Sequence, residues 1–417
     1  MNQEVNQPVK PKPRFFYGYV VVVAASSIRM VMVGPRSAFG VFFKPLIAEF
    51  GWSRALISGA FSVHSVMQGL SGTVMGGLND RFGPRVVMTF CGFLVGLTCL
   101  LMSQISASWQ LYLFYLVMGI GMGGSFPPTM STVARWFAKR RSVMTGFVLA
   151  GGGIGGMIAP PVANWLISTY GWRNAYIIMG ALVLVLAILI AQFLRRDPAK
   201  MGQVPYGENE GQEQRLDSGI EGFSFKEATL TRQFWMVFVM IFCFGFSYVV
   251  NAVHIVPHAT DLGISAASAA NVLATISGTF LLGGIVMGSV ADRIGNRQTL
   301  IICFILMTAA LFWLLAAREA WMLYLFAAVL GFGGGGAGML ESTLPAELFG
   351  MRSHGLILGV ISVGFTIGAA VGPFITGYIF DVSGSYQPAF LINAVVGVVG
   401  LILAATLRPT KRLGGRI

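Results

Sequence analysis

Charged residues are scarce in this sequence of 417 residues, because Asp, Glu, Lys and Arg together make up 11% of it. In soluble domains these residues make up roughly a quarter. Hydrophobic residues account for 55% of the chain, and the mean hydropathy is +0.74. The shortage of charge excludes a soluble globular domain and predicts an all-α protein that crosses a membrane several times.

Cysteine and histidine are also scarce, with four residues of each. No pair of cysteines has the spacing of a metal or redox site, so we expect reduced packing residues. The sequence has neither a Walker loop nor a Ser/His/Asp set, which argues against an enzyme and against a bound metal or cofactor. The runs GIGMGG, GGGIGG and GFGGGG lack the strand–turn–helix context of a phosphate loop, so close helix packing explains them better. The cysteines are Cys91, Cys99, Cys243 and Cys303.

Acidic residues number 16 against 28 Lys and Arg, which gives a net charge of +12. The chain contains twelve apolar segments of about 20 residues, the length of a membrane-spanning helix. With the N-terminus in the cytoplasm, 22 of the 28 basic residues fall in cytoplasmic segments. This positive-inside pattern predicts a multi-pass protein of a cell inner membrane with both termini cytoplasmic, and it removes the case for a nucleic-acid partner. The apolar segments lie near residues 17–40, 54–78, 86–105, 110–133, 143–168, 174–194, 234–257, 267–291, 298–317, 321–345, 354–378 and 386–407.

The two halves of the chain repeat one another. GGLNDRFGPR (76–85) matches MGSVADRIGNR (287–297), and GIGMGGSFPPTMSTVARWF (119–137) matches GFGGGGAGMLESTLPAELF (331–349) at a constant offset of 212. Two like-oriented six-helix halves around a central cavity are a known transporter layout. We therefore predict a cytoplasmic tail 1–16, an N-terminal six-helix half 17–194, a cytoplasmic linker 195–233, a C-terminal six-helix half 234–407 and a cytoplasmic tail 408–417.

An aspartate–arginine pair recurs in the loop after the second segment of each half. The first loop contains Asp80, Arg81 and Arg85, and the second contains Asp292 and Arg293. An aspartate here can cap the next helix, and the arginines can pair with carboxylates or with helix ends. We predict that these residues form a conformational latch between the halves; the alternative is that they only anchor the loops on the cytoplasmic side.

Two arginines, Arg29 and Arg36, interrupt the first apolar segment one heptad apart. Seven residues make almost two full turns of an α-helix, so both side chains lie on nearly the same face of the helix. An arginine within hydrocarbon costs about 2.5–3.5 kcal/mol on insertion scales. We predict that both arginines bind substrate in the central cavity. For Arg36 the alternative is a side chain that reaches the outer surface.

Other polar groups inside the apolar segments are histidines, an asparagine and one carboxylate. We predict that Asn251 and His254 bind substrate, and that His64 and His254 couple transport to protons, because the ordinary histidine pKa lies near neutrality. For His64 the alternative is a hydrogen bond across helices. Glu341 is expected to form a structural ion pair with the segment ARWFAKRR (134–141). An interior that is cationic or protonatable suits an anion. The stripe in the seventh segment has spacings of four, three and four, through Ser247, Asn251, His254 and His258.

The loop GGLNDRFGPR resembles the signature G-x-L-x-D-R-x-G-x-R of the major facilitator superfamily, and the likeness covers the whole chain. FFYGYVVVVAAS and ARWFAKRRSVMTGFVLAGGGIGG are similar to the monocarboxylate transporter family and its bacterial relatives, with the oxalate–formate branch nearby. The resemblance implies twelve helices in two pseudo-symmetric halves and secondary active transport of a small organic anion, a monocarboxylate carried with a proton. The alternatives are an anion exchanger of the oxalate–formate type and a transporter-like sensor that moves nothing.

The resemblance also places individual residues. Arg36 falls where the family carries a basic residue implicated in substrate and proton handling, and His254 falls where bacterial lactate-type relatives carry a histidine lining the site. In the eighth segment the family carries an arginine for the substrate carboxylate, whereas this chain has Phe280 and Gly284 there. We therefore expect the anion to bind the arginines of the first segment, with a tail bulkier than that of lactate beside Gly284.

Overall fold

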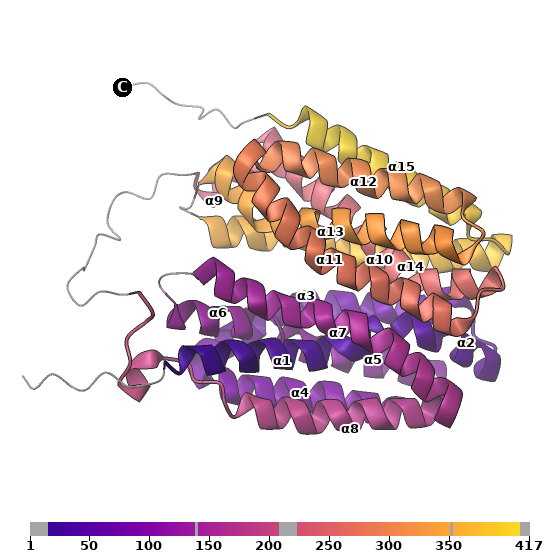
Figure 1. Ribbon diagram of the computed structural model, residues 1–417, viewed down its shortest axis with the longest axis horizontal. Helices are drawn as coiled ribbons and strands as arrows, with labels where there is room; N and C mark the ends of the chain where they lie inside the picture. Colours follow the sequence, from indigo (N-terminus) through magenta and orange to yellow (C-terminus); the bar gives the residue numbers. More distant parts are fainter. Residues whose placement is uncertain (1–15, 138–140, 208–222, 351–352, 409–417) are drawn as a thin grey trace, which may run out of the picture.

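The computed structural model describes residues 16–137, 141–207, 223–350 and 353–408, and its long elements are all α-helices (Figure 1). The N-terminal half consists of α1 (Gly18–Ser37), α2 (Phe39–Phe50), α3 (Arg54–Phe82), α4 (Pro84–Met102), α5 (Ser108–Gly123), α6 (Pro127–Trp136), α7 (Arg141–Tyr170) and α8 (Trp172–Ala191). The C-terminal half consists of α10 (Arg232–Asp261), α11 (Ala266–Ile294), α12 (Asn296–Ala316), α13 (Ala320–Phe349), α14 (His354–Ser383) and α15 (Gln387–Thr406). A 3-10 turn (Pro198–Met201) and the short α9 (Phe225–Thr229) lie between them.

Ten helical segments among the described residues are long and apolar enough to cross a membrane. One of them joins α1 and α2 into a 33-residue segment, Gly18–Phe50. Two further predicted segments correspond to α3 and to the consecutive helices α5 and α6, which are 16 and 10 residues long. These helices are not among the ten, but they pack in the same bundle. The all-α membrane architecture expected from the composition is therefore confirmed.

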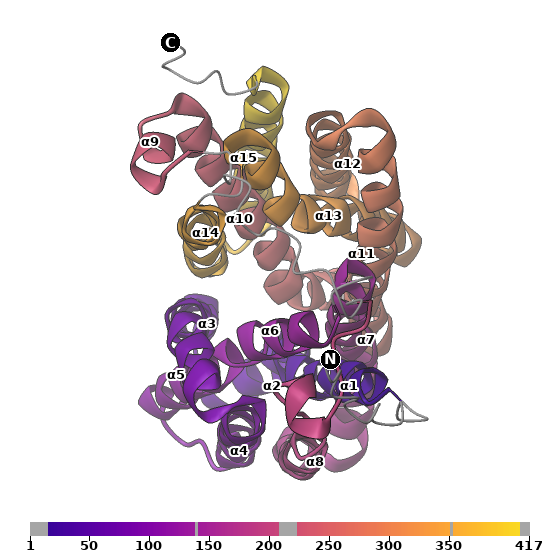
Figure 2. The ribbon, with the colours of Figure 1, turned by 90° about the vertical axis from the view of Figure 1, so that its left-hand side faces the viewer.

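The two halves lie side by side, with α1–α8 on one side of the bundle and α10–α15 on the other (Figures 1 and 2). The main contacts between them are those of α3 with α14 and of α7 with α11. We call the end that holds Phe16 and Arg408 the terminal end. The opposite end, which we call the distal end, holds the connections α2–α3, α10–α11 and α14–α15 (Figure 1).

The repeat seen in the sequence also appears in the backbone. Gly83, between α3 and α4, and Gly295, between α11 and α12, both have positive φ, 81° and 93°. Only glycine adopts this conformation without a steric cost, so it allows the chain to turn sharply into the next helix. In each half, an arginine that follows this turn donates a hydrogen bond to a backbone carbonyl at the end of the last helix of that half. Arg85 donates to the end of α8 at 2.9 Å, and Arg297 donates to the end of α15 at 2.6 Å.

Candidate functional site

A small cavity of about 40 Å³ lies between the two halves. Arg36 lies near the middle of the Gly18–Phe50 segment and contributes to its wall. Two helices of each half line the cavity, which places it where a transported solute could contact both halves. The lining residues are Arg36 and Ser37 of α1, Phe61 of α3, Tyr248, Val249 and Ala252 of α10, and Leu273, Ile276 and Ser277 of α11.

Arg36 is the charged group of this cavity. Pro35 precedes it inside α1, where it cannot donate a backbone hydrogen bond, and α1 gives way to α2 at Ala38. The guanidinium lies 5.3 Å from the centre of the Phe61 ring, and its buried Nε has no hydrogen-bond partner among the described residues. No described carboxylate forms an ion pair with Arg36, and a buried charge without a counter-charge is costly. Arg36 therefore lines the cavity between the halves, with no counter-charge among the described residues.

Arg29 lies in a different environment from Arg36. Its Nη1 donates to the backbone carbonyl of Ser125 at 3.3 Å, and its guanidinium lies 5.2 Å from the centre of the Phe126 ring. Ser125 and Phe126 form the break between α5 and α6. Arg29 does not line the cavity of Arg36, although its Nε is also buried without a described partner.

Three hydroxyl groups line the cavity beside Arg36, on Ser37, Tyr248 and Ser277. The Tyr248 ring lies 5.1 Å from the ring of Phe280, and its hydroxyl has no hydrogen-bond partner among the described residues. The sequence did not reveal these three residues, because a serine or tyrosine in an apolar helix looks like a packing residue. Tyr248 could have been identified from the sequence, because it directly follows Ser247, a residue of the polar stripe.

The polar stripe of α10 does not line the cavity. The Asn251 side-chain amide donates to the Ser247 carbonyl one turn earlier, at 2.7 Å. His254 is fully buried; its Nε2 lies 2.9 Å from the Pro373 carbonyl and its Nδ1 lies 3.2 Å from the Tyr386 hydroxyl. Because a carbonyl can only accept, Nε2 carries the proton and Nδ1 accepts from the tyrosine. Both residues are therefore separated from the cavity in this conformation.

His64 of α3 is fully buried, and its ring lies 5.7 Å from that of Phe61 on the same helix and 6.1 Å from that of Tyr115 on α5. Neither of its ring nitrogens has a hydrogen-bond partner among the described residues. A buried imidazole without a partner is unusual, and it lies one turn from the Phe61 side chain that Arg36 contacts. His64 is thus linked to the Arg36 cavity through this shared neighbour, Phe61.

The proposed latch residues lie at the terminal end. The side chains of Asp80 and Asp292 lie outside the described part of the structure. Arg81 and Arg293 are exposed, and Arg81 lies over the ring of Phe82, which follows it in the chain. Arg85 is tied to the end of α8 by its hydrogen bond, so it anchors a loop within the N-terminal half.

Glu341 accepts a hydrogen bond at 2.7 Å from Ser362 of α14. The expected ion pair with residues 134–141 is not found among the described residues, and residues 138–140 lie outside them. The four cysteines are buried and free, and the described residues contain no group of His, Cys, Asp and Glu able to hold a metal.

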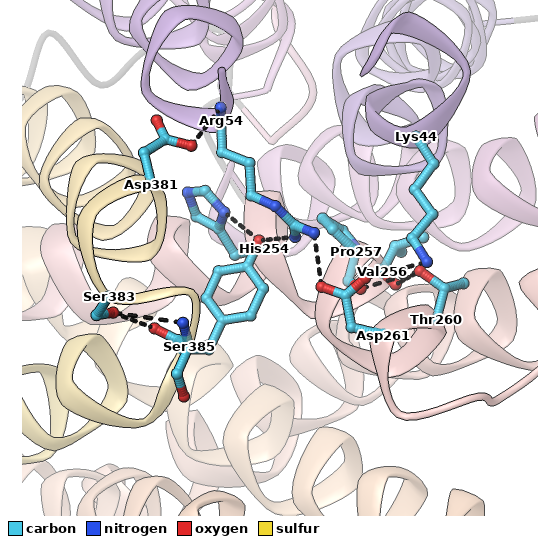
Figure 3. Close-up of polar contacts among 11 residues, drawn as sticks. Lys44, Arg54, His254, Val256, Pro257, Thr260, Asp261, Asp381, Ser383 and Ser385 are labelled. Atoms are coloured by element: carbon cyan, nitrogen blue, oxygen red, sulfur yellow. Dashed lines mark hydrogen bonds and ion pairs between the residues drawn. The ribbon is translucent and has the colours of Figure 1, made fainter. Parts of the chain in front are cut away.

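A polar network joins the two halves at the distal end (Figure 3). The Asp261 carboxylate at the end of α10 pairs with Lys44 of α2 at 3.1 Å and with Arg54 of α3 at 2.7 Å. The Asp381 carboxylate of α14 accepts from the backbone N–H groups of Arg54 and Ala55, at 2.9 and 2.7 Å. We call these contacts the distal contact. The hydrogen bonds and ion pairs that join the halves, in the part of the chain that the structure describes, gather towards this end.

Arg54 is held in the distal contact by aromatic residues as well. Its guanidinium lies 3.7 Å from the centre of the Phe380 ring and donates to the Tyr386 hydroxyl at 2.6 Å. Only 11% of its side chain is exposed. Because Tyr386 also bonds His254, the buried histidine stabilises the distal contact rather than the cavity.

The sequence was compared with known families and curated proteins. The family Major Facilitator Superfamily matches residues 25–258 and 237–415. Monocarboxylate transporter 13 of Bos taurus is 28% identical over 394 residues, which cover 94% of this chain and 89% of that protein. The Oxalate:formate antiporter of Oxalobacter formigenes is 26% identical over 413 residues, or 96% and 94% of the two chains. The probable sulfoacetate transporter SauU of Cupriavidus necator is 25% identical over 392 residues, 88% of each.

A solved structure shares the fold. A bacterial homologue of the human lysosomal transporter Spinster, in an inward-facing and unoccupied conformation, superposes with a TM-score of 0.72 at 18% identity, covering 96% of this chain and 97% of that one. The occupied form of that protein gives a TM-score of 0.73.

Proposed function

This chain belongs to the major facilitator superfamily, and from that premise we propose that it is a secondary active transporter of a small organic anion, a monocarboxylate carried with a proton. It is a multi-pass membrane protein related to monocarboxylate transporters and to an oxalate:formate antiporter. We place it in a cell inner membrane with the terminal end in the cytoplasm, as the distribution of basic residues predicts.

One observation carries the proposal: Arg36 lines a cavity between the halves, and it has no carboxylate partner among the described residues. A guanidinium binds a carboxylate through two parallel, charge-assisted hydrogen bonds, which are stronger than hydrogen bonds between neutral groups. The three cavity hydroxyls add donors beside it. Arg29, Asn251 and His254 remain proposed contributors to substrate binding that would need to move towards the cavity to touch the anion.

Alternating access would come from rocking of the two halves about this cavity. The distal contact closes one end by two carboxylates that pair across the halves. The terminal end would then be the open one, and the anion would leave or enter on the cytoplasmic side. Opening the distal end requires the contacts of Asp261 and Asp381 to break.

Proton coupling is proposed for His64, with His254 acting through the distal contact. In proteoliposomes, uptake of a labelled carboxylate should rise with an inward proton gradient and fall when a protonophore is added. His64→Ala should lose gradient-driven accumulation yet keep exchange of labelled for unlabelled anion, because exchange needs no net proton movement. His258→Ala, a histidine buried against Phe390, is the matched control and should retain both.

Exchange of one anion for another is the second candidate, favoured by the relative described as an oxalate:formate antiporter. Uptake that ignores the protonophore and requires anion inside the vesicle would establish this candidate instead of symport.

The loop residues Asp80, Arg81, Asp292 and Arg293 are proposed to act on conformation. Asp80→Asn should lower the transport rate while leaving equilibrium anion affinity within a few-fold, since the residue lies at the terminal end of α3, far along the helix from Phe61. Transport rate and equilibrium binding measured on the same preparation would test this. A large loss of affinity would contradict the latch.

A further inference from the structure

In the distal contact the cations and the carboxylates belong to different halves of the protein (Figure 3). Its cations, Lys44 and Arg54, belong to α2 and α3 of the N-terminal half, whereas its carboxylates, Asp261 and Asp381, belong to α10 and α14 of the C-terminal half. When the halves part at this end, each side keeps charges of one sign. The N-terminal half then presents two cations without their partners at the mouth of the pathway.

The two cations hold a carboxylate in the way that a binding site would. One oxygen of Asp261 pairs with Lys44 Nζ at 3.1 Å and the other with Arg54 Nη2 at 2.7 Å. Each oxygen therefore has its own cation, which is favourable geometry for carboxylate recognition. The Arg54 side chain is 11% exposed and that of Asp261 is 29% exposed, so this pair is partly desolvated.

The adjacent start of α3 binds a carboxylate as well. Asp381 accepts from the N–H groups of Arg54 and Ala55, the first two residues of this 29-residue helix. Helix N-termini bind anions through such free N–H groups and the helix dipole. Arg54 thus contributes its side chain to one carboxylate and its backbone to the other.

We propose that Lys44 and Arg54 form an outer binding site for the carboxylate of an organic anion, and that Asp261 occupies this site while the distal end is closed. The proposal rests on the proposed function for the opening motion. Lys44 follows Arg36 by eight residues, about 12 Å of helix, so an anion bound there would lie on the way to the cavity. The anion and Asp261 compete for the same cations. A carboxylate on the distal side must therefore shift the halves towards the open state.

Opening can be measured with a cysteine placed behind the distal contact. Ser58 of α3 is fully buried, and its hydroxyl donates to the Arg54 carbonyl at 2.7 Å. Ser58→Cys should react with a membrane-impermeant maleimide only when the distal end opens, and the four native cysteines are buried. Ser62→Cys, one turn deeper, is a second reporter in case the first fails to fold. Both reporters are combined with Arg36→Ala, so that binding in the cavity cannot cause the response.

The probe is sodium acetate, compared with sodium chloride at equal ionic strength. Acetate should raise the labelling rate several-fold over chloride, and Lys44→Gln should remove most of that difference. Asp261→Asn removes the charge that competes with acetate, so it should raise the labelling rate even without acetate. It should also lower, at least about tenfold, the acetate concentration that gives half of the maximal increase in labelling rate. Arg173→Gln is the matched control, since Arg173 pairs with Glu49 inside the N-terminal half at the same end; it should change neither quantity.

Two results would overturn the proposal. The first is that acetate and chloride give equal labelling in every variant while Asp261→Asn still opens the distal end, which would make the contact a lock without a binding site. The second is that Arg173→Gln abolishes the acetate response as Lys44→Gln does, which would indicate general surface charge. Because the cavity arginine is absent throughout, neither result bears on the Arg36 site.

Discussion

Arg36→Ala should abolish organic-anion binding in the cavity. Removing one partner of a buried charged pair costs about 2–5 kcal/mol, which corresponds to roughly 30-fold to several-thousand-fold in Kd. Arg36→Lys should fall between alanine and the unmodified protein, because the charge remains but the planar fork that matches a carboxylate is lost. Equilibrium binding of a labelled panel of mono- and dicarboxylates to purified protein measures the effect.

Arg29→Gln serves as the internal comparison for this prediction. Its guanidinium is held by the Ser125 carbonyl and does not line the cavity, so we expect a smaller loss of affinity than at Arg36. An unchanged affinity in Arg36→Ala, or a larger loss in Arg29→Gln, would move the anion site away from the cavity.

Gly283→Ala should strongly destabilise the protein, whereas Gly284→Ala should not. A Cβ at Gly283 would lie 2.0 Å from the carbonyl oxygen of Phe332 on α13, a contact with backbone that cannot move aside. A Cβ at the neighbouring Gly284 would meet the Gly335 oxygen at 3.4 Å, an ordinary contact. Overpacking of this kind costs about 1–3 kcal/mol and occasionally more.

The thermal unfolding midpoint of each purified variant in detergent would measure this difference. The pair is closely matched, because the two glycines are consecutive in one helix and the substitution is the same. Equal midpoints for the two variants would contradict the close approach of α11 to α13.

Much of the fold could be predicted from the sequence, because a membrane imposes it on local composition. A long apolar run must form a helix to satisfy its backbone, so the segments could be identified without long-range information. The assignment of the glycine runs to close packing agrees with Gly335 of the run GFGGGG, where a Cβ would overlap the backbone carbonyl oxygen of Phe280 on α11. Arg36 lines the cavity between the halves, as expected from the cost of placing a cation among lipid chains.

The cavity itself could not be predicted in the same way, because it depends on which face of each helix meets the other half. On α10 the polar stripe pointed to Asn251 and His254, whereas Tyr248, Val249 and Ala252 line the cavity in this structure. Neighbouring residues on a helix point in different directions, so a shift of one position changes the face entirely.

The role expected for Gly284 also differs from what the structure shows. The absence of a side chain there suggested free volume for a large substrate tail. Instead Gly284 lies against Gly335 at the α11–α13 crossing and does not line the cavity. A glycine can allow two helices to pack closely or can leave room for a substrate. Which of these applies depends on whether another helix packs against it, and this is not visible in the sequence.

The distal contact was not predicted at all. Arg54, Asp261 and Asp381 lie at or near helix ends, and Lys44 lies within the short helix α2. The two cations are far from the two carboxylates in the sequence. Their pairing depends on how the two halves approach each other, which no local pattern encodes. The boundaries of the two halves and the cytoplasmic position of the termini remain predictions.

Counterflow in proteoliposomes tests the central claim most directly. Vesicles loaded with one unlabelled solute are placed in the same labelled solute, with a panel of mono- and dicarboxylates, a neutral sugar and an organic cation. We predict transient accumulation of at least one carboxylate by the unmodified protein, none by Arg36→Ala, and none of the sugar or the cation by either. Accumulation of the sugar or the cation without any carboxylate would contradict the account.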